Sequence, residues 1–330
     1  MSDGWLTALA ATPELSEAVQ VVGLVDLDRS VAEARAAKHG LDVAIDTDLG
    51  AMLSRMKPDF VFDLVVPSAR SGVVKQALAA GAHVLSEKPM ANSMAEARDL
   101  IAAAERAGRQ HAVIQNRRFL PGIRRAQALI NSGALGEVTA VHVDFFIGAH
   151  FGGFRDEMEN VLLLDMAIHT FDAARFVTGL DAMAVYCRET NPKGSWYAHG
   201  AAADALFDLE GGATMTYRGS WCAEGANTSW ESTWRIIGTR GTLLWDGNDS
   251  LEAKVVTGDQ GFMRPLSSVE VPPLPAPLVE GHAGVILDFV NAVASGRRAL
   301  TDGQDNIRSL AMVFAAIAST KAGQRLPVTI

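Results

Sequence analysis

The stretch His83-Val-Leu-Ser-Glu-Lys-Pro-Met-Ala-Asn92 decides the fold. Its apolar pair, Val84 and Leu85, predicts a short buried strand. Pro89 lacks an N–H and biases the residue before it toward an extended backbone, so the ladder of the strand cannot continue. The stretch therefore predicts that Lys88 is presented where the strand ends at its carboxyl side.

Helices are predicted on both sides of this strand. Residues 71–80 form a helical pattern closed by Gly81, and Ser93 with Glu96 three residues later is a capping box that opens a helix over residues 93–107. In an open α/β sheet, ligands bind at the carboxyl ends of the strands. A lone lysine before proline is more often an ordinary surface residue in a loop, so the rest of the chain has to decide.

The first third of the chain alternates strands and helices. Its expected strands lie at residues 19–26, near 44, 60–66 and 111–115, and its further helices at residues 3–11, 29–39 and 48–56. Strands that are apolar throughout and alternate with helices indicate a parallel sheet covered on both faces. Residues 1–118 are therefore predicted to form a doubly wound Rossmann-type α/β domain.

The pattern changes after Pro121, where strand-like runs follow one another. They lie at residues 138–147, 182–188, 203–209, 213–221, 233–237, 242–245 and 251–256, with helices expected at 124–130, 161–178, 282–294 and 306–321 and a proline-rich loop at 272–277. Consecutive strands without helices between them favour a mostly antiparallel sheet. Residues 119–330 are therefore predicted to form an α+β domain for substrate binding and oligomerisation.

Composition and charge exclude several classes of protein. The 330 residues are 48% apolar and 20% charged, with a net charge of −9, which argues for a globular protein and against nucleic acid or an acidic membrane surface as partner. The longest apolar run, residues 310–318, is too short to span a bilayer, and Asp3 stands where a signal peptide carries positive charge. Cys187 and Cys222 have no metal or redox spacing, so a cytoplasmic protein is expected.

Polar or special residues stand at four strand ends of the first domain. They are Asp26, Pro67, the pair Glu87-Lys88 and the pair Gln115-Asn116. An acid at the position of Asp26 hydrogen-bonds the ribose hydroxyls of a dinucleotide and disfavours a 2′-phosphate, although aspartate after a strand is also common in turns. The convergence of the four ends predicts a dinucleotide-binding edge, where the Asp26 carboxylate would favour NAD over NADP.

A second group of polar residues lies on a helix of the second domain. Asp165, His169 and Asp172 are spaced by four and three residues, which places them on one helical face. A buried histidine between two surface acids is the simplest interpretation. An acid four residues before a histidine can also orient it as a proton shuttle, and the three residues together are able to ligate a metal.

These pieces, in this order, resemble the Gfo/Idh/MocA oxidoreductases. The resemblance includes Val-Val-Gly-Leu-Val-Asp at 21–26, Glu-Lys-Pro at 87–89, Gln-Asn-Arg-Arg-Phe-Leu-Pro at 115–121, Gly-Ala-Leu-Gly-Glu-Val at 133–138, the pair Asp165 and His169, and the closing helix at 311–323. It implies an NAD(P)-dependent dehydrogenase of sugars, cyclitols or related polyols. It also implies that His169 exchanges the proton of the reacting hydroxyl, that Lys88 holds its oxygen, and that Asp165 orients the histidine or a substrate hydroxyl.

The sequence departs from the family pattern in three places. Pro67 is followed by Ser71 where the family has histidine, and Glu159-Asn160 and Ala167 replace glycines around the helix acid. The first strand and its glycine-rich phosphate loop are missing before residue 19. In a doubly wound sheet that strand lies at the centre. Either the natural chain starts earlier, which we favour, or the strands at residues 19–26 and 60–66 pair directly.

Two other functions remain open. A metal-dependent hydrolase would use Asp165, His169 and Asp172 with a further ligand, His142 or His150. A catalytically idle sensor would bind ligand without turnover.

Strands such as residues 214–217 and 234–237 carry large apolar groups on both faces, so we expect the open face of the sheet to pair in a homo-oligomer, a dimer or tetramer. The particular sugar and the reaction direction do not follow from the sequence.

Overall fold

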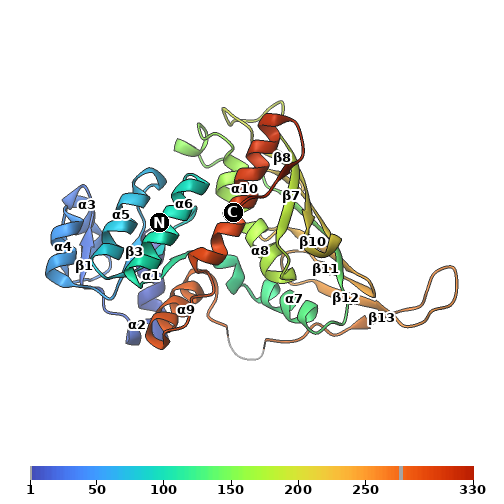
Figure 1. Cartoon of the computed structure of the whole chain (residues 1–330), viewed down its shortest axis with the longest axis horizontal. Helices are drawn as coiled ribbons and strands as arrows, with labels where there is room; N and C mark the ends of the chain where they lie inside the picture. The colour runs from blue at the N-terminus through green and yellow to red at the C-terminus, as the bar shows by residue number, and fades with distance from the viewer. Residues whose placement is uncertain (1, 275–277) are drawn as a thin grey trace. The chain divides into compact units, whose positions relative to one another are not determined.

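The computed structural model in Figure 1 describes residues 2–274 and 278–330. The chain forms two compact units, one of residues up to Asn116 together with Val279–Ile307, and one of Arg117–Leu278 together with Arg308–Ile330. The first boundary lies close to the predicted one. The segment Val279–Ile307, which the sequence assigned to the second domain, instead belongs to the first unit, where Gln110 Nε2 donates to Arg297 O at 2.7 Å.

The first unit contains two small parallel sheets. One pairs β1 with β2 and the other has the strand order β3-β4-β5. The bounds are Gly23–Val25 for β1, Ala44–Asp46 for β2, Phe60–Asp63 for β3, His83–Ser86 for β4 and His111–Val113 for β5. Within the described residues no ladder joins β1 to β3, so the direct pairing of residues 19–26 with 60–66 does not form. The strands are also shorter than expected.

Seven α-helices of the described chain lie in the first unit. They are α1 Ser2–Ala11, α2 Pro13–Ala18, α3 Arg29–Lys38, α4 Leu49–Met56, α5 Pro67–Ala79, α6 Met94–Ala107 and α9 Gly281–Ser295. The helix expected from Ser71 starts four residues earlier, at Pro67, and Pro13 opens α2, which was not predicted. Proline suits the first helical position because its N–H would have no partner there and its φ is already helical.

The predicted capping box at the start of α6 is confirmed with one shift. The Ser93 hydroxyl oxygen accepts from the Glu96 amide at 3.1 Å. The Glu96 carboxylate accepts from the amide of Asn92, one residue before the cap, at 2.6 Å. Both bonds satisfy backbone donors at the start of the helix, so they fix where the loop after β4 ends.

The second unit is built on one nine-stranded sheet, of order β13-β12-β11-β10-β6-β9-β8-β7-β14. All neighbouring strands are antiparallel except β6 and β9, which are parallel. The bounds are β6 Val138–Phe146, β7 Ala182–Thr190, β8 Ala202–Leu209, β9 Thr214–Ser220, β10 Thr233–Gly238, β11 Gly241–Trp245, β12 Leu251–Val256, β13 Leu266–Val269 and β14 Leu326–Pro327. The mostly antiparallel sheet is confirmed, while β13 and β14 were not predicted.

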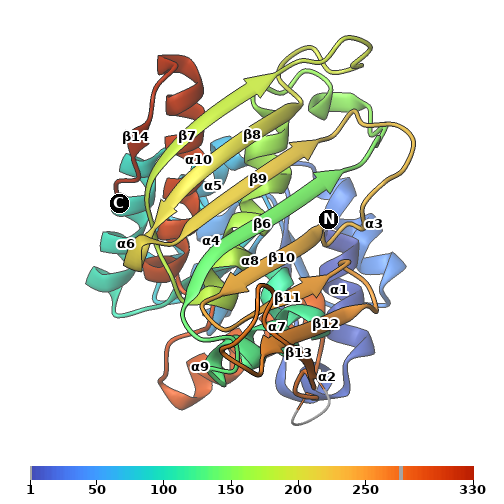
Figure 2. The same cartoon turned by 90° about the vertical axis from the view of Figure 1, so that its right-hand side faces the viewer.

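Helices of this unit cover one face of the sheet, and the other face is turned to the viewer in Figure 2. They are α7 Pro121–Asn131, a π-helix at Leu162–Ala167 that continues into α8 Ile168–Thr178, and most of α10 Gly303–Ala322. The ring of Phe171 on α8 packs edge-on against Phe207 and Tyr217 of the sheet. No helix in the described residues is long and apolar enough to cross a membrane. Of the predicted proline-rich loop, residues 275–277 lie outside the described residues.

Candidate active site

The backbone that carries Lys88 is held on both sides. Before it, the buried carboxylate of Glu87 accepts from the Trp5 indole N–H at 2.9 Å and from the Lys88 amide at 3.3 Å. After it, Arg70 Nη1 donates to the carbonyl of Pro89 at 2.5 Å. Lys88 is therefore fixed where β4 ends, as the sequence predicted, by partners that come from α1 and α5.

Arg70 is the residue that ties this loop to the neighbouring strand. Its Nε donates to Asp63 Oδ2 at 2.9 Å and its Nη2 to the Val65 carbonyl at 2.8 Å, and the side chains of this ion pair are 1% and 0% exposed. Burial raises the pKa of the Asp63 carboxyl, and the Arg70 charge opposes that rise. Sequence reasoning missed this pair, although an acid at a strand end followed by an arginine seven residues later is a usable signal.

A second buried polar contact lies directly before the Glu87-Lys88 pair. Ser86 Oγ and His111 Nε2 are 3.0 Å apart across the β4–β5 pairing. Burial, and to a lesser extent the Arg70 charge, lowers the pKa of His111 to about 3. The imidazole is therefore neutral at physiological pH and has a structural role under the loop.

The other predicted cofactor residues have different surroundings. Asp26 is exposed after β1, and its Oδ1 accepts from the Asp28 amide at 3.0 Å, which is turn chemistry, while its Oδ2 has no hydrogen-bond partner in the described part of the chain. The Pro67 carbonyl accepts from Asn92 Nδ2 at 2.8 Å. Gln115 is 1% exposed, and its Nε2 has no hydrogen-bond partner among the described residues. A buried amide donor of this kind is open to a ligand acceptor.

His282 on α9 is a site residue that the sequence did not suggest. Its Nδ1 lies 3.4 Å from Asn116 Nδ2, and its ring packs edge-on near Trp5. Burial lowers the pKa of His282, the Glu87 charge raises it and the Lys88 charge lowers it. The first unit thus gathers His282 beside the two strand ends at Glu87-Lys88 and Asn116. The sequence analysis placed α9 in the second domain, so it did not predict that His282 lies near Glu87-Lys88.

In the second unit, Asp165 lies in the π-helix and His169 in the first turn of α8. Arg155 Nε donates to Asp165 Oδ2 at 2.7 Å. The segment that precedes the π-helix begins at Asn160, whose φ of 52° is left-handed. Asparagine tolerates this conformation, so it takes the place of the glycine that the family has there. Single-turn π segments within α-helices are frequent at functional sites.

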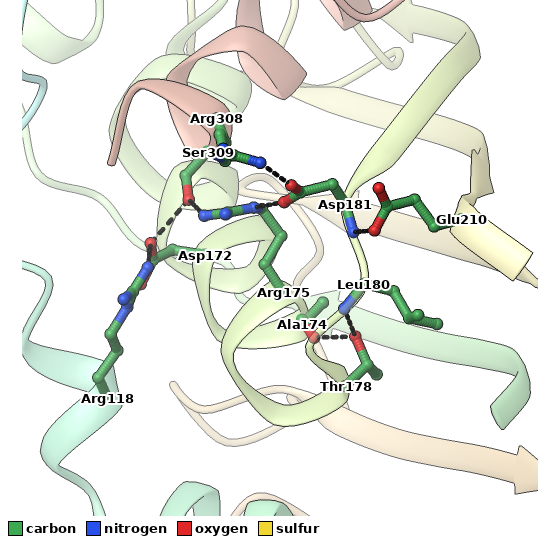
Figure 3. Close-up of polar contacts among 10 residues, drawn as sticks. All are labelled: Arg118, Asp172, Ala174, Arg175, Thr178, Leu180, Asp181, Glu210, Arg308 and Ser309. Atoms are coloured by element: carbon green, nitrogen blue, oxygen red, sulfur yellow. Dashed lines mark hydrogen bonds and ion pairs between the residues drawn. The ribbon is translucent and has the colours of Figure 1, made fainter. Parts of the chain in front are cut away.

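Asp172, the third member of the predicted face, has a structural role. It is 1% exposed and accepts from Arg118 Nε at 2.7 Å, from Arg118 Nη2 at 2.6 Å and from the Ser309 hydroxyl at 2.7 Å (Figure 3). The adjacent Arg175 pairs with Asp181 at 2.8 Å. The bidentate contact with Arg118 occupies both Asp172 oxygens.

The ligand set of the hydrolase hypothesis is not assembled. His142 Nδ1 lies 2.6 Å from Thr216 Oγ1, and His150 forms an ion pair with Glu224 at 2.9 Å while stacking on Trp196. Within residues 2–274 and 278–330, no group of three His, Cys, Asp or Glu side chains is placed to hold a metal ion.

Two family models match this chain. One is described as an oxidoreductase family with an NAD-binding Rossmann fold and matches residues 5–115, and the other is the GFO/IDH/MocA C-terminal domain and matches residues 123–244. The chain belongs to the Gfo/Idh/MocA oxidoreductase family. The predicted fold class, NAD cofactor and dehydrogenase activity are thereby confirmed, and they are favoured over the hydrolase and the idle sensor.

Curated relatives and solved structures agree with this membership. The chain is 29% identical to an uncharacterised protein, y4oX, of Sinorhizobium fredii over 94% of this chain and 88% of that one. It is 28% identical to a D-apiose dehydrogenase of Paraburkholderia graminis over 93% and 83%. An Agrobacterium radiobacter oxidoreductase, crystallised with NAD⁺, L-tartaric acid and magnesium, shares the fold with a TM-score of 0.85 at 22% identity, covering 99% of this chain and 95% of that one.

The residues present fit the cofactor of the family. The exposed Asp26 carboxylate at the end of β1 suits ribose hydroxyls, and the unpartnered Nε2 of Gln115 suits a polar acceptor of the cofactor. Lys88 and Asn116 follow β4 and β5, whose parallel pairing brings their carboxyl ends to one edge. NAD bound to this edge would supply the hydride acceptor of the reaction.

Proposed function

We propose that this chain is an NAD-dependent dehydrogenase that oxidises a CH–OH group of a sugar, cyclitol or related polyol, or reduces the matching carbonyl. The observation that carries the proposal is Lys88, fixed on both sides at the end of β4 in a family that binds NAD. The D-apiose dehydrogenases among the relatives support a sugar as the substrate.

Each candidate residue has a role in this chemistry. Lys88 donates a charge-assisted hydrogen bond to the reacting oxygen and stabilises the alkoxide that develops on it. His169 takes the hydroxyl proton during oxidation and returns it during reduction. Asp165, whose charge is shared with Arg155, orients His169 or a neighbouring substrate hydroxyl. A screen of aldoses, polyols and cyclitols with NAD, read by the absorbance of NADH, tests the proposal; absence of turnover across the screen contradicts it.

NAD is proposed over NADP because of Asp26. Its carboxylate is exposed at the end of β1 and repels a 2′-phosphate, while it accepts hydrogen bonds from the ribose hydroxyls. The nearby Arg29 is engaged by Glu33 at 2.8 Å and by the Ile45 carbonyl. We therefore expect kcat/KM with NAD to exceed kcat/KM with NADP. The Asp26→Ser variant should have a smaller ratio of these two values than the wild type. A wild-type preference for NADP would contradict this assignment.

The assembly proposal rests on the open face of the sheet. Strand pairing places Arg188 opposite Asp204, Asp204 opposite Arg218, and Arg218 opposite Asp144, so four neighbouring strands carry a row of alternating charges. Within the chain, Arg218 Nε donates to Asp144 at 2.7 Å. We name these four residues the charged row. Exposed apolar side chains on the same face are Tyr186, Leu206 and Leu244.

A second copy of the chain complements the charged row. If a two-fold axis runs parallel to the strands between β8 and β9, the order of the row is reversed in the partner. Arg188 then faces Asp144 of the other copy, and Asp204 faces Arg218, so every contact joins opposite charges. We propose a homodimer through this face. Two free cysteines, Cys187 and Cys222, support a cytoplasmic location.

A further inference from the structure

Arg155 is held rigidly beside Asp165. Its guanidinium carbon lies 5.1 Å from the ring centroid of Phe151 and 4.8 Å from that of Phe154. Its Nε donates to Asp165 Oδ2 at 2.7 Å. Two aromatic contacts and one ion pair fix the plane of the guanidinium at low conformational cost, and they do so next to the acid of the proposed site.

The far end of this guanidinium is open. Its Nη1 and Nη2 have no hydrogen-bond partner among the described residues, and the side chain is 29% exposed. These two nitrogens carry four N–H donors in fixed directions. Asp165 beside them is 14% exposed and accepts hydrogen bonds. The pair therefore presents donors and an acceptor together, which is the combination that vicinal hydroxyl groups require.

Exposed aromatic rings lie on one side of Arg155 and continue from Phe151 to two tryptophans. Phe154 is 70%, Trp230 48% and Phe151 45% exposed, and the ring of Phe151 lies 6.2 Å from that of Trp230 and 5.2 Å from that of Trp221. These residues come from the segments after β6 and after β9. Exposed aromatic faces carry partial negative charge and favour contact with the polarised C–H groups of a sugar ring.

The charge of the same segment restricts the substrate. Residues 151–165 contain one cation, Arg155, and four carboxylates, Asp156, Glu157, Glu159 and Asp165, so their formal charge is −3. A sugar acid or sugar phosphate would be repelled by this segment, because Arg155 is already shared with Asp165. A neutral polyol meets no such repulsion.

We propose that Arg155, with the rings of Phe151, Phe154 and Trp230, forms the substrate-recognition surface of this enzyme and selects neutral sugars or cyclitols over their acids. The inference rests on the proposed dehydrogenase function and assigns the residues that bind the substrate. Arg155 donates from its Nη atoms to ring hydroxyls, Asp165 accepts from a neighbouring hydroxyl, and the three rings contact the apolar face of the sugar.

The test compares four variants with the wild type, using D-glucose and D-galactose with D-glucuronate and D-galacturonate, which keep the anomeric hydroxyl group and add a carboxylate at C6, and myo-inositol as a neutral cyclitol. Arg155→Ala should raise KM for the best neutral substrate about tenfold or more, with partial rescue in Arg155→Lys. Phe154→Leu, which keeps an apolar side chain on the surface, should raise KM about threefold. Arg325→Ala is the matched control, since Arg325 Nε pairs with Asp208 at 2.6 Å in the same unit, and its KM should not change.

The outcomes separate this inference from the function on which it rests. If the wild type oxidises none of these compounds with NAD, the proposed function fails first. If it oxidises a neutral sugar but Arg155→Ala and Phe154→Leu keep the KM of the Arg325→Ala control, the recognition surface is wrong. A higher kcat/KM for the acids overturns the neutral class. NADH titration of each variant confirms that it is folded, so that a rise in KM reports substrate binding.

Discussion

At the scale of single residues, the chemistry of this chain depends on how Lys88 is held. Arg70 reaches the Asp63 carboxylate and the carbonyls of Val65 and Pro89 with three of its nitrogens. The position of Lys88 was readable from the sequence because a proline after a buried strand fixes where that strand ends. The spacing of Asp63 and Arg70 was a signal that the sequence analysis did not use, and the contact of Arg70 with the Pro89 carbonyl joins segments that are separated along the chain.

Substituting Arg70 should show this dependence. Arg70→Lys keeps the positive charge but has no fork of donors, so we expect kcat to fall about tenfold or more while KM for NAD changes little. Arg70→Ala leaves Asp63 as a buried unpaired acid and should lower the free energy of unfolding by about 3–5 kcal/mol.

Lys75→Ala on the exposed face of α5 provides the control. Lys75 pairs with Asp99 at the surface, where an ion pair contributes about 0–1 kcal/mol. Kinetics and denaturant unfolding of the three variants check both expectations. An unchanged kcat in Arg70→Lys, with normal kcat in the control, would remove Arg70 from the positioning of Lys88.

At the scale of elements, the helical spacing of apolar residues and the capping, glycine and proline residues at helix ends located most helices. The lengths of the strands, in contrast, depend on tertiary pairing. The apolar run at residues 19–26 was expected to be one strand, but the strand that pairs with β2 covers only Gly23–Val25. The helix start at Pro67 was missed because a proline after an apolar run was interpreted only as a stop. The π-helix at Leu162–Ala167 has no distinct periodic signal, so the sequence predicted a plain helix there.

The start of that π-helix gives a prediction about Asn160. Its φ of 52° disfavours residues that have a branched or bulky side chain, and its Nδ2 contacts Glu189. Asn160→Val should therefore lower the free energy of unfolding by about 1–3 kcal/mol, because it combines backbone strain with the loss of the contact. Asn160→Gly also removes the contact, but glycine adopts a positive φ without strain. It should therefore lower the free energy of unfolding by less than Asn160→Val does. Thermal unfolding of both variants decides; equal losses would show that the backbone conformation does not matter.

At the scale of the whole molecule, two units with different sheet types were predictable, but their composition was not. Alternating helices and apolar strands predicted the parallel sheets, and consecutive strands predicted the antiparallel one. The return of Val279–Ile307 to the first unit was missed because such a return depends on packing and leaves no local pattern. The resemblance indicated the cofactor-side and helix residues, whereas Arg70, Arg155 and His282 emerged only from their contacts.

The charged row makes the assembly testable by charge reversal. Arg188→Asp and Asp144→Arg should each weaken the homodimer, because like charges then face each other across the axis. In a mixture of the two variants, residue 188 of each chain meets residue 144 of opposite charge in the other, so a heterodimer should form.

Analytical ultracentrifugation of each variant and of the mixture measures this. Glu17→Lys, at an exposed position of α2 in the first unit, is the control and should stay dimeric. A monomeric wild type, or a mixture no more associated than its components, would contradict the proposed axis.

The most direct measurement of the central claim is the rate of NADH formation by wild type and Lys88→Ala with the best neutral sugar. Loss of a preorganised donor to the developing alkoxide should lower kcat about 10²–10³-fold, while NADH binding changes less than about threefold because a group that acts in the transition state contributes little to ground-state affinity. Lys75→Ala should match the wild type. A Lys88→Ala enzyme that keeps its kcat within about threefold of the wild type would contradict the account.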